Sequence, residues 1–329
     1  MEYAEYMAMM IERFWQFKKK HFKNEEHIFE QTYEQNPQRP PVFKRELGDK
    51  NVLLHLESRD ELKCKVKTAI PMKRWHRWFT SMTSSQALAQ SVFGNLKAYG
   101  KLNILADVIS DDGKPPFGFI CDNGNEIEME KVILYLGESR QKTHIDVFFG
   151  GPHQITVECK LTEQEIGPCS RPRLRKSAPN YEKDYCDGNY VIQRKREERC
   201  SLTEIGVRYW DYIPDYLNWD PTIDFSPCPL NSTYQLVRNI LAACLKPKSG
   251  SESETEKAEG HAVLLYDARN PEFKQNGKGW QGYAELKDAL KDKSLLRSCT
   301  WQDIIRSMAK NKDLDWLREM LREKYGLEA

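Results

Sequence analysis

Several hallmarks of common protein classes are missing from this chain of 329 residues. No apolar run is long enough to cross a bilayer and no secretory signal peptide is recognisable, so we expect a cytoplasmic protein without a membrane role. The nine cysteines are odd in number and no pair has Cys-x-x-Cys spacing, so buried thiols are a better interpretation than disulfides, zinc or iron–sulfur sites. The formal net charge of +1 provides no overall field that would attract nucleic acid.

Glycine-rich phosphate loops, internal repeats and Ser/His/Asp motifs are also missing, but two neighbouring apolar segments carry two acids and a lysine. The second segment, 154–160, alternates polar and apolar residues, which is the period of a strand with one buried face. Glu158 and Lys160 therefore point to the same side. The preceding segment, 143–149, is β-branched and aromatic, and the Gly-Gly-Pro sequence at 150–152 favours a hairpin turn between them.

The register of this hairpin decides whether a second acid joins the same side of the sheet. If Gly150 pairs with Gln154, Asp146 lies directly opposite Glu158, where facing Cβ atoms are roughly 4.5–5.5 Å apart. A register shifted by one residue would instead turn Asp146 to the apolar face. We therefore predict that Asp146, Glu158 and Lys160 converge on one side.

Two carboxylates and a lysine in this arrangement are typical of metal-dependent phosphodiester cleavage. Asp146 and Glu158 can bind Mg²⁺ or Mn²⁺ and leave coordination positions for water and a phosphate oxygen. The ion would lower the pKa of a water, and Lys160 would orient or deprotonate that water or stabilise the transition state. The alternative is a solvent-facing strand whose charges only keep it soluble, since an acid two positions before a lysine also occurs elsewhere, as at Glu272 and Lys274.

The same residues resemble the motif of the PD-(D/E)XK nuclease superfamily, in particular of its bacterial restriction-endonuclease-like members. Asp146 and the tripeptide Glu158-Cys159-Lys160 match the motif, although Ile145 stands where a proline is common. Similar members also carry a Ser-Gln pair, a Thr-Glu pair after the lysine and a Gln-Leu-x-Arg-Asn run. The corresponding residues here are Ser85-Gln86, Thr162-Glu163 and Gln235-Leu236-Val237-Arg238-Asn239, with a looser likeness at Thr300-Trp301 and Lys324-Tyr325-Gly326.

The resemblance implies an α/β fold with a restriction-endonuclease-like αβββαβ core, a mixed central sheet, flanking helices and a large insertion. All six core elements can be placed in order along the chain. They are a helix beginning at Ser84-Ser85-Gln86, strands at 131–137, 143–149 and 154–160, a helix with Tyr234, Val237, Leu241 and Cys244 on its apolar face, and a strand at 261–267.

The length of the chain allows one large domain with insertions. We predict an N-terminal helical segment at 1–40 and a nuclease domain at 41–329. Within this domain we place the core at 84–268, an insertion at 161–229, a serine-rich acidic loop at 249–260 and C-terminal helices at 280–326.

Further residues are candidates for the metal site or for contact with nucleic acid. Glu138 follows the first expected strand and is either a further metal ligand or only a turn acid. His144 shares the predicted face of Asp146, where it would touch a phosphate or simply pack. Trp75 and Trp78 lie in a basic run, where they would stack on bases or pack in the core. Candidates for nucleic-acid contact on the two core helices and in a basic run of the insertion are Gln86, Gln235, Arg238, Asn239, Arg171, Arg173, Arg175 and Lys176.

The leading hypothesis is an Mg²⁺-dependent DNA endonuclease of restriction or defence type. Nucleic acid, above all DNA, is the expected partner, and a homodimer is one arrangement that would allow a double-strand cut. Two alternatives remain, a nuclease directed at RNA and a non-catalytic nucleic-acid-binding or interaction module on the same fold. The intact Asp146, Glu158 and Lys160 favour catalysis, because a degenerate copy tends to lose one of them.

Overall fold

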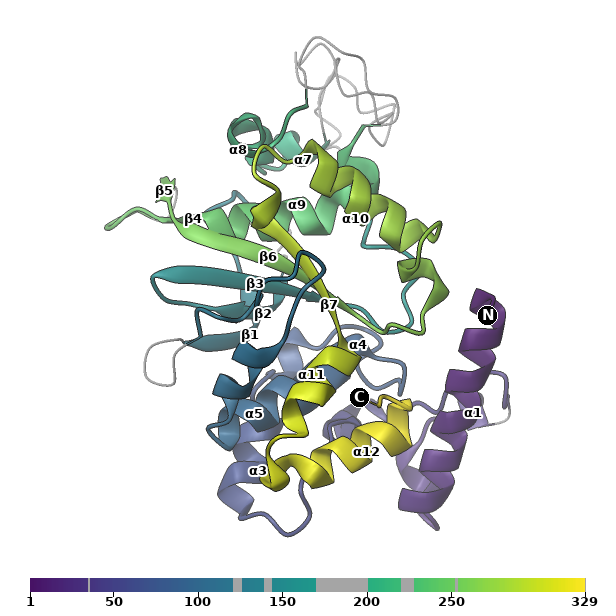
Figure 1. The fold of residues 1–329 in the computed structure, drawn as a ribbon. Coiled ribbons are helices and arrows are strands. Elements are labelled where there is room, and N and C mark those ends of the chain that lie inside the picture. The colour runs from purple at the N-terminus through teal and green to yellow at the C-terminus, as the bar shows by residue number, and fades with distance from the viewer. Residues whose placement is uncertain are drawn as a thin grey trace.

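A mixed five-stranded sheet forms the centre of the structure, a computed structural model that describes residues 1–34, 36–120, 126–138, 144–169, 201–219, 228–251 and 254–328 (Figure 1). The first three strands are antiparallel, and the last two run parallel to the third. In spatial order the strands are β1 (Ile127–Val132), β2 (His144–Phe149), β3 (His153–Cys159), β6 (Glu259–Tyr266) and β7 (Leu296–Thr300).

Helices cover both faces of this sheet, so two separate hydrophobic cores form (Figure 1). The helices are α1 (Tyr3–His21), α2 (Gln31–Glu34), α3 (Asp60–Lys67), α4 (Ser85–Ala89), the π-helical η4 (Gln90–Gly94), α5 (Asn95–Ala98), α7 (Ser201–Glu204), α8 (Tyr209–Tyr216), α9 (Leu230–Cys244), α10 (Lys278–Ala289), α11 (Trp301–Met308) and α12 (Asp315–Tyr325). Val263 and Leu265 of β6 join the core that α1, α4, α11 and α12 complete. Ala262 and Leu264 join the core that α8, α9 and α10 complete. This alternation is the two-residue period of a strand buried on both faces.

Shorter elements connect these layers. A two-stranded antiparallel ribbon follows α9, and single turns of 3₁₀-helix occur along the chain. These elements are β4 (Leu245–Pro247), β5 (Thr255–Lys257), η1 (Glu26–Ile28), η2 (Arg45–Asn51), η3 (Met72–Arg74), η5 (Leu102–Asp107), η7 (Pro271–Phe273), η8 (Lys293–Leu295) and η9 (Lys312–Leu314).

The predicted fold class, hairpin register and helix cap are confirmed. The fold is α/β with a mixed central sheet, and the Oγ of Ser84 accepts a hydrogen bond from the N–H of Ala87 at the start of α4 (3.1 Å). Extending the observed strand pairing by one residue places Asp146 opposite Glu158. The paired residues of the hairpin are Val147 with Val157, Phe148 with Thr156 and Phe149 with Ile155.

Three boundaries differ from the predictions. The first strand occupies 127–132 rather than 131–137, because Ile133 and Leu136 leave the sheet and are buried in the core beside α9. The apolar run at 133–136 therefore has the sequence pattern of a strand, although it lies outside β1. β5 and the start of β6 lie in the stretch predicted as a loop, and β7 lies in the region predicted to contain only helices.

The N-terminal helix packs against the C-terminal one beside the lower face of the sheet in Figure 1. Tyr6, Met10 and Phe14 of α1 are buried in the same core as Leu317 and Leu321 of α12. The predicted domain boundary at residue 40 stays a prediction. Within the described ranges, none of the helices combines the length and the apolar character that a bilayer crossing requires.

Candidate active site

A cavity of 940 Å³ opens where β3 ends and β2 begins, and it contains the acids and the lysine predicted from the sequence. One wall comes from the sheet, the segment that follows β3 and α9, and the other comes from α1, the segments before α4 and the start of α4. The lining residues are Glu130, His144, Asp146, Glu158, Cys159, Lys160, Thr162, Glu163, Gln235 and Arg238 on the first wall, and Met7, Arg39, Pro40, Val42, Lys73, Arg74, Trp75, His76, Arg77, Trp78, Ser81, Thr83, Ser84, Ser85 and Gln86 on the second.

Asp146, Glu158 and Lys160 converge in this cavity. The ammonium of Lys160 donates hydrogen bonds to Glu158 Oε1 and to Gln235 Oε1, both at 2.8 Å. The main-chain N–H of Cys159 donates to Asp146 Oδ2 at 2.7 Å, which ties the acid of β2 to the neighbouring strand. The geometry expected from the hairpin register is therefore present, and the catalytic role of these residues stays a prediction.

The polar stripe of α9 faces the acids. Arg238 Nη2 and Asn239 Nδ2 donate to Glu158 Oε2 at 3.3 and 3.0 Å, while the Oε1 of Gln235 accepts from Lys160. Asn239 is fully buried and does not line the cavity, so its predicted contact with nucleic acid does not fit this structure. The stripe instead holds the carboxylate of Glu158 and the amine of Lys160 in place.

Glu130 lines the cavity, whereas Glu138, which the sequence offered as either a further metal ligand or only a turn acid, does not. Glu138 lies outside the cavity and accepts a hydrogen bond from the hydroxyl of Tyr209. Glu130 Oε2 pairs with His144 Nδ1 at 3.1 Å, so His144 does share the side of Asp146 as predicted. Glu130 adopts φ +52°, a region that a residue with a side chain rarely occupies and that occurs preferentially at functional sites.

Burial and neighbouring charges shift the two central pKa values. The pKa of Asp146 is raised well above its usual range by burial, then by the carboxylates of Glu158 and Glu130. Burial pushes the pKa of Lys160 down, but the carboxylates of Glu158 and Glu163 outweigh it, so the pKa is raised overall. The carboxylates that surround Asp146 therefore disfavour its charged form, whereas the same kind of neighbour favours the charged form of Lys160.

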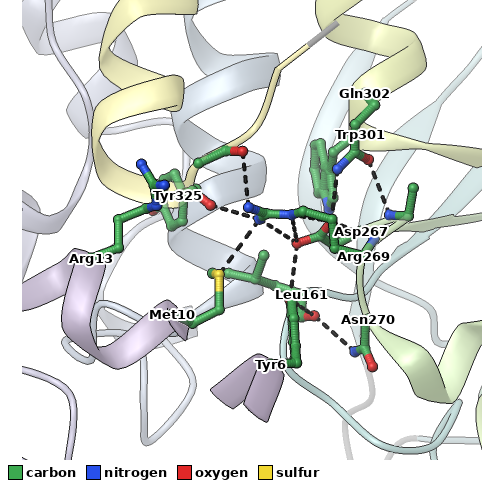
Figure 2. Close-up of polar contacts among 12 residues, drawn as sticks. Tyr6, Met10, Arg13, Leu161, Asp267, Arg269, Asn270, Trp301, Gln302 and Tyr325 are labelled. Atoms are coloured by element: carbon green, nitrogen blue, oxygen red, sulfur yellow. Dashed lines mark hydrogen bonds and ion pairs between the residues drawn. The ribbon is translucent and has the colours of Figure 1, made fainter. Parts of the chain in front are cut away.

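Side chains that are distant in the sequence anchor the main chain at Lys160 and Leu161, and Figure 2 shows the contacts of Leu161. Trp301 Nε1 donates to the carbonyl of Lys160 at 2.9 Å. The next carbonyl, that of Leu161, accepts from the hydroxyl of Tyr6 at 2.9 Å and from Asn270 Nδ2 at 3.0 Å. Residues that lie far apart in the sequence therefore fix the backbone that carries the lysine.

A buried ion pair supports this anchor (Figure 2). Arg269 Nη2 contacts Asp267 Oδ2 at 2.6 Å, and the same guanidinium donates to the carbonyls of Tyr325 and Gly326 at 2.7 and 2.9 Å. Asp267 also accepts from the hydroxyl of Tyr6 at 2.9 Å. Tyr325 and Gly326 therefore help to position the backbone beside Lys160, although they do not line the cavity.

Two sequence pairs noted for their family likeness meet at the cavity wall. Ser85 Oγ donates to Glu163 Oε1 at 2.6 Å, and the N–H of Leu161 donates to the other oxygen of the same carboxylate at 2.6 Å. Gln86 is also buried at the wall, where its amide accepts from the N–H of His76 (2.8 Å) and donates to the carbonyl of Arg74 (3.1 Å). Gln86 therefore shapes the opposite wall instead of offering a free amide to nucleic acid.

The remaining predicted contacts cannot be placed. Arg171, Arg173, Arg175 and Lys176 lie outside the described residues. Among the described side chains, no group of three or more His, Cys, Asp and Glu residues forms a ready-made metal-binding set. Any cation would therefore need water or substrate oxygens to complete its coordination.

Comparison with known proteins identifies the family. No curated protein and no solved structure matches the chain. A family model described as Restriction Endonuclease associating with ARP matches residues 16–326, a span that runs from α1 through the cavity to the glycine that ends α12. The chain therefore belongs to the family Restriction Endonuclease associating with ARP.

Proposed function

We propose that the protein is a DNA endonuclease of restriction or defence type, with a PD-(D/E)XK-type site that uses Mg²⁺ or Mn²⁺ to hydrolyse phosphodiester bonds. The observation that carries this proposal is the convergence of Asp146, Glu158 and Lys160 on one cavity in a chain of a restriction-endonuclease family. The family description supports a nuclease, and the metal and the DNA substrate are inferred from the chemistry of the residues.

The acids of the cavity suit a hard divalent cation. Asp146, Glu158 and Glu130 share one cavity, and their repulsion contributes to the raised pKa of Asp146. Carboxylate oxygens are the ligands that Mg²⁺ prefers, and Mg²⁺ usually keeps several waters. Asp146 and Glu158 would hold the ion, with Glu130 as the further acid. When bound, such an ion supplies positive charge to the phosphate and lowers the pKa of the attacking water.

The side chains around Glu158 have separate roles in this proposal. Arg238 and Asn239 hold its Oε2, so the carboxylate keeps one orientation while Oε1 faces Lys160. The ammonium of Lys160 brings positive charge to the place where charge develops on the phosphate.

The proposal is tested by incubating the purified protein with plasmid, linear and single-stranded DNA and with RNA, in Mg²⁺, Mn²⁺ or EDTA. We expect cleavage of DNA that EDTA abolishes, and a loss of about 10²–10⁴-fold in rate for Lys160→Ala. Lys274→Ala is the matched control, because this exposed lysine also follows an acid by two positions but lies outside the cavity.

Three outcomes would contradict parts of the proposal. Equal rates for wild type and Lys160→Ala would remove the catalytic role of the site. Cleavage of RNA but not DNA would assign the site to an RNA-directed nuclease. Binding of DNA without cleavage of any substrate, by a protein with native thermal unfolding, would favour the non-catalytic binding module.

A further inference from the structure

The wall of the cavity opposite the acids carries an exposed tryptophan. Trp78 retains 44% of its accessible surface, and in the described part of the chain the only other exposed large aromatic residue is Phe119. Trp78 lines the cavity, whereas Phe119 lies beside His153 at the opposite end of β3. An exposed indole that lines a polar cavity offers a large flat surface for contact with a ligand.

The neighbouring Trp75 shows that packing does not explain Trp78. Trp75 stacks on Phe79 with ring centroids 4.3 Å apart, and its Nε1 donates to the carbonyl of Ile70 at 3.1 Å. The sequence placed both tryptophans in one basic run and left stacking on bases and core packing open for each. Both rings line the cavity, but Trp75 is used in packing, whereas Trp78 is exposed beside Arg77, whose Cζ lies 5.1 Å from the indole centroid.

The backbone that carries Trp78 is held to the elements of the site. Gln86 of α4 bonds the main chain of His76 and Arg74, as described above, and the N–H of Trp78 donates to His76 Nδ1 at 3.3 Å. Arg74 Nη1 also donates to the carbonyl of Glu130 at 3.1 Å, which ties the segment to β1. The backbone that carries the indole is therefore held in place, which reduces the conformational entropy lost when the segment binds a ligand.

Two cations that line the cavity together with Trp78 are available to meet phosphates. Arg74 is neutralised by Glu128 at 2.9 Å, but among the described residues no carboxylate lies within ion-pair distance of Lys73 or Arg77. Both are exposed and both line the cavity that contains the acids. A phosphate chain that enters the cavity would thus meet these two cations as well as the proposed cation site.

We propose that Trp78 stacks on an unpaired base of the substrate, with Arg77 and Lys73 against the flanking phosphates. A base offers its face to an indole only when it is outside a continuous duplex stack, and such stacking is largely independent of sequence. The substrate class is therefore DNA with an unpaired nucleotide beside the phosphate to be cut, either single-stranded or locally opened. This inference rests on the proposed function, because it assumes that the cavity receives a DNA strand.

The test measures DNA binding by fluorescence anisotropy in EDTA at fixed salt, with a labelled single strand, the matching duplex and the same duplex carrying one extra unpaired base. Trp78→Ala is expected to weaken binding of the single strand and of the bulged duplex by about 5- to 140-fold, the range measured for loss of one base–aromatic stack. Binding of the plain duplex should change by less than about twofold. Trp78→Phe keeps a ring and should retain most of the affinity, and Phe119→Ala should bind as wild type does.

Three results would overturn the inference. Trp78→Ala could weaken binding of the single strand and the duplex equally, or leave the binding of every DNA unchanged. Alternatively, Phe119→Ala could show the same loss as Trp78→Ala. Thermal unfolding of each variant, together with the retained affinity of Trp78→Phe, separates loss of the ring from loss of the fold. Cleavage assays separate this result from the nuclease assignment. DNA cleavage that is sensitive to Lys160→Ala, without an effect of Trp78→Ala on binding, overturns only the base contact. Weaker binding by Trp78→Ala, without any DNA cleavage that depends on Lys160, supports the base contact and overturns the nuclease assignment.

Discussion

Lys160 and Lys324 are both buried in this protein, with 6% and 1% of their surfaces exposed, but their surroundings give them opposite properties. The pKa of Lys160 is raised because carboxylates outweigh its burial. The pKa of Lys324 is lowered well below its usual value by burial, and its ammonium donates to Asn51 Oδ1 at 2.7 Å and to the carbonyl of the same residue.

The difference teaches that neighbours, and not depth, decide whether a buried lysine keeps its charge. Burial disfavours the charged form at both places, and only the carboxylates near Lys160 reverse the effect. Lys160 is thus suited to chemistry that depends on local charge, whereas Lys324 supports structure. Lys324 thereby positions Asn51, whose Nδ2 in turn donates to the carbonyls of Phe79 and Ser81 at the cavity wall.

Removal of the structural lysine should produce the largest loss of stability. We expect Lys324→Ala to lower the free energy of unfolding by about 2–5 kcal/mol, because it leaves a cavity and two unpaired acceptors on Asn51. Urea unfolding measures this loss. Cleavage per folded molecule should stay at the wild-type level below the new unfolding transition, and a loss of cleavage as large as that of Lys160→Ala would abolish the distinction between the two lysines.

Addition of metal should stabilise the protein through the acids around Lys160 and not through the region around Lys324. If Asp146 and Glu158 bind Mg²⁺, a concentration of 100 times Kd should raise the free energy of unfolding by about 2.7 kcal/mol. EDTA should reverse the change. Asp146→Asn should abolish it, whereas Lys324→Met should leave it intact. A stabilisation that persists in Asp146→Asn would place the ion elsewhere.

The pH dependence of stability should report Lys324. Between its depressed pKa and the ordinary value of about 10.4, the unfolded state binds more protons than the native state, so stability rises with pH across this window. The slope attributable to one lysine is at most about 1.4 kcal/mol per pH unit. Urea unfolding at a series of alkaline pH values should show a smaller slope in Lys324→Met than in wild type, and identical slopes would count against a depressed pKa.

The smallest expected effect tests the link between the two regions. Tyr6→Phe removes the hydroxyl that bonds Leu161, next to Lys160, and Asp267, whose partner Arg269 bonds Tyr325. We expect a loss of about 1 kcal/mol in stability. A fall in kcat of less than about tenfold, with KM unchanged, would accompany it.

The matched control for this variant is Tyr135→Phe, because that hydroxyl also donates to a main-chain carbonyl, that of Ala242, and makes no bond to the backbone at Lys160 and Leu161. Urea unfolding and steady-state cleavage measure both variants. A fall in kcat that is the same in the two would show that Tyr6 acts only through general stability.

The hairpin could be predicted from the sequence because a strand period of two and a short turn leave few registers. One buried face then decides among them, and Asp146, Glu158 and Lys160 follow from the result. The surroundings of the α9 stripe could not be predicted in the same way. A helical pattern shows that Arg238 and Asn239 share a face, but not whether that face meets water or a buried acid.

Other features depend on contacts that no local pattern records. Glu130 has an unusual φ for its residue type, and the apolar run that follows it resembles a strand more than the observed β1 does. Trp301 acts through a single hydrogen bond to the carbonyl of Lys160 across a sequence separation of 141 residues. Such long-range contacts become visible only once the sheet brings the segments together.

Residues 6, 269 and 325 meet in space although the ribosome joins them to the chain at very different times. The guanidinium of Arg269 is held by carbonyls at 325 and 326, and its partner Asp267 shares Tyr6 with the backbone beside Lys160. A nascent chain whose residues 325 and 326 are still inside the exit tunnel lacks these carbonyls. The support of the lysine is therefore incomplete in a growing chain until residue 326 has emerged.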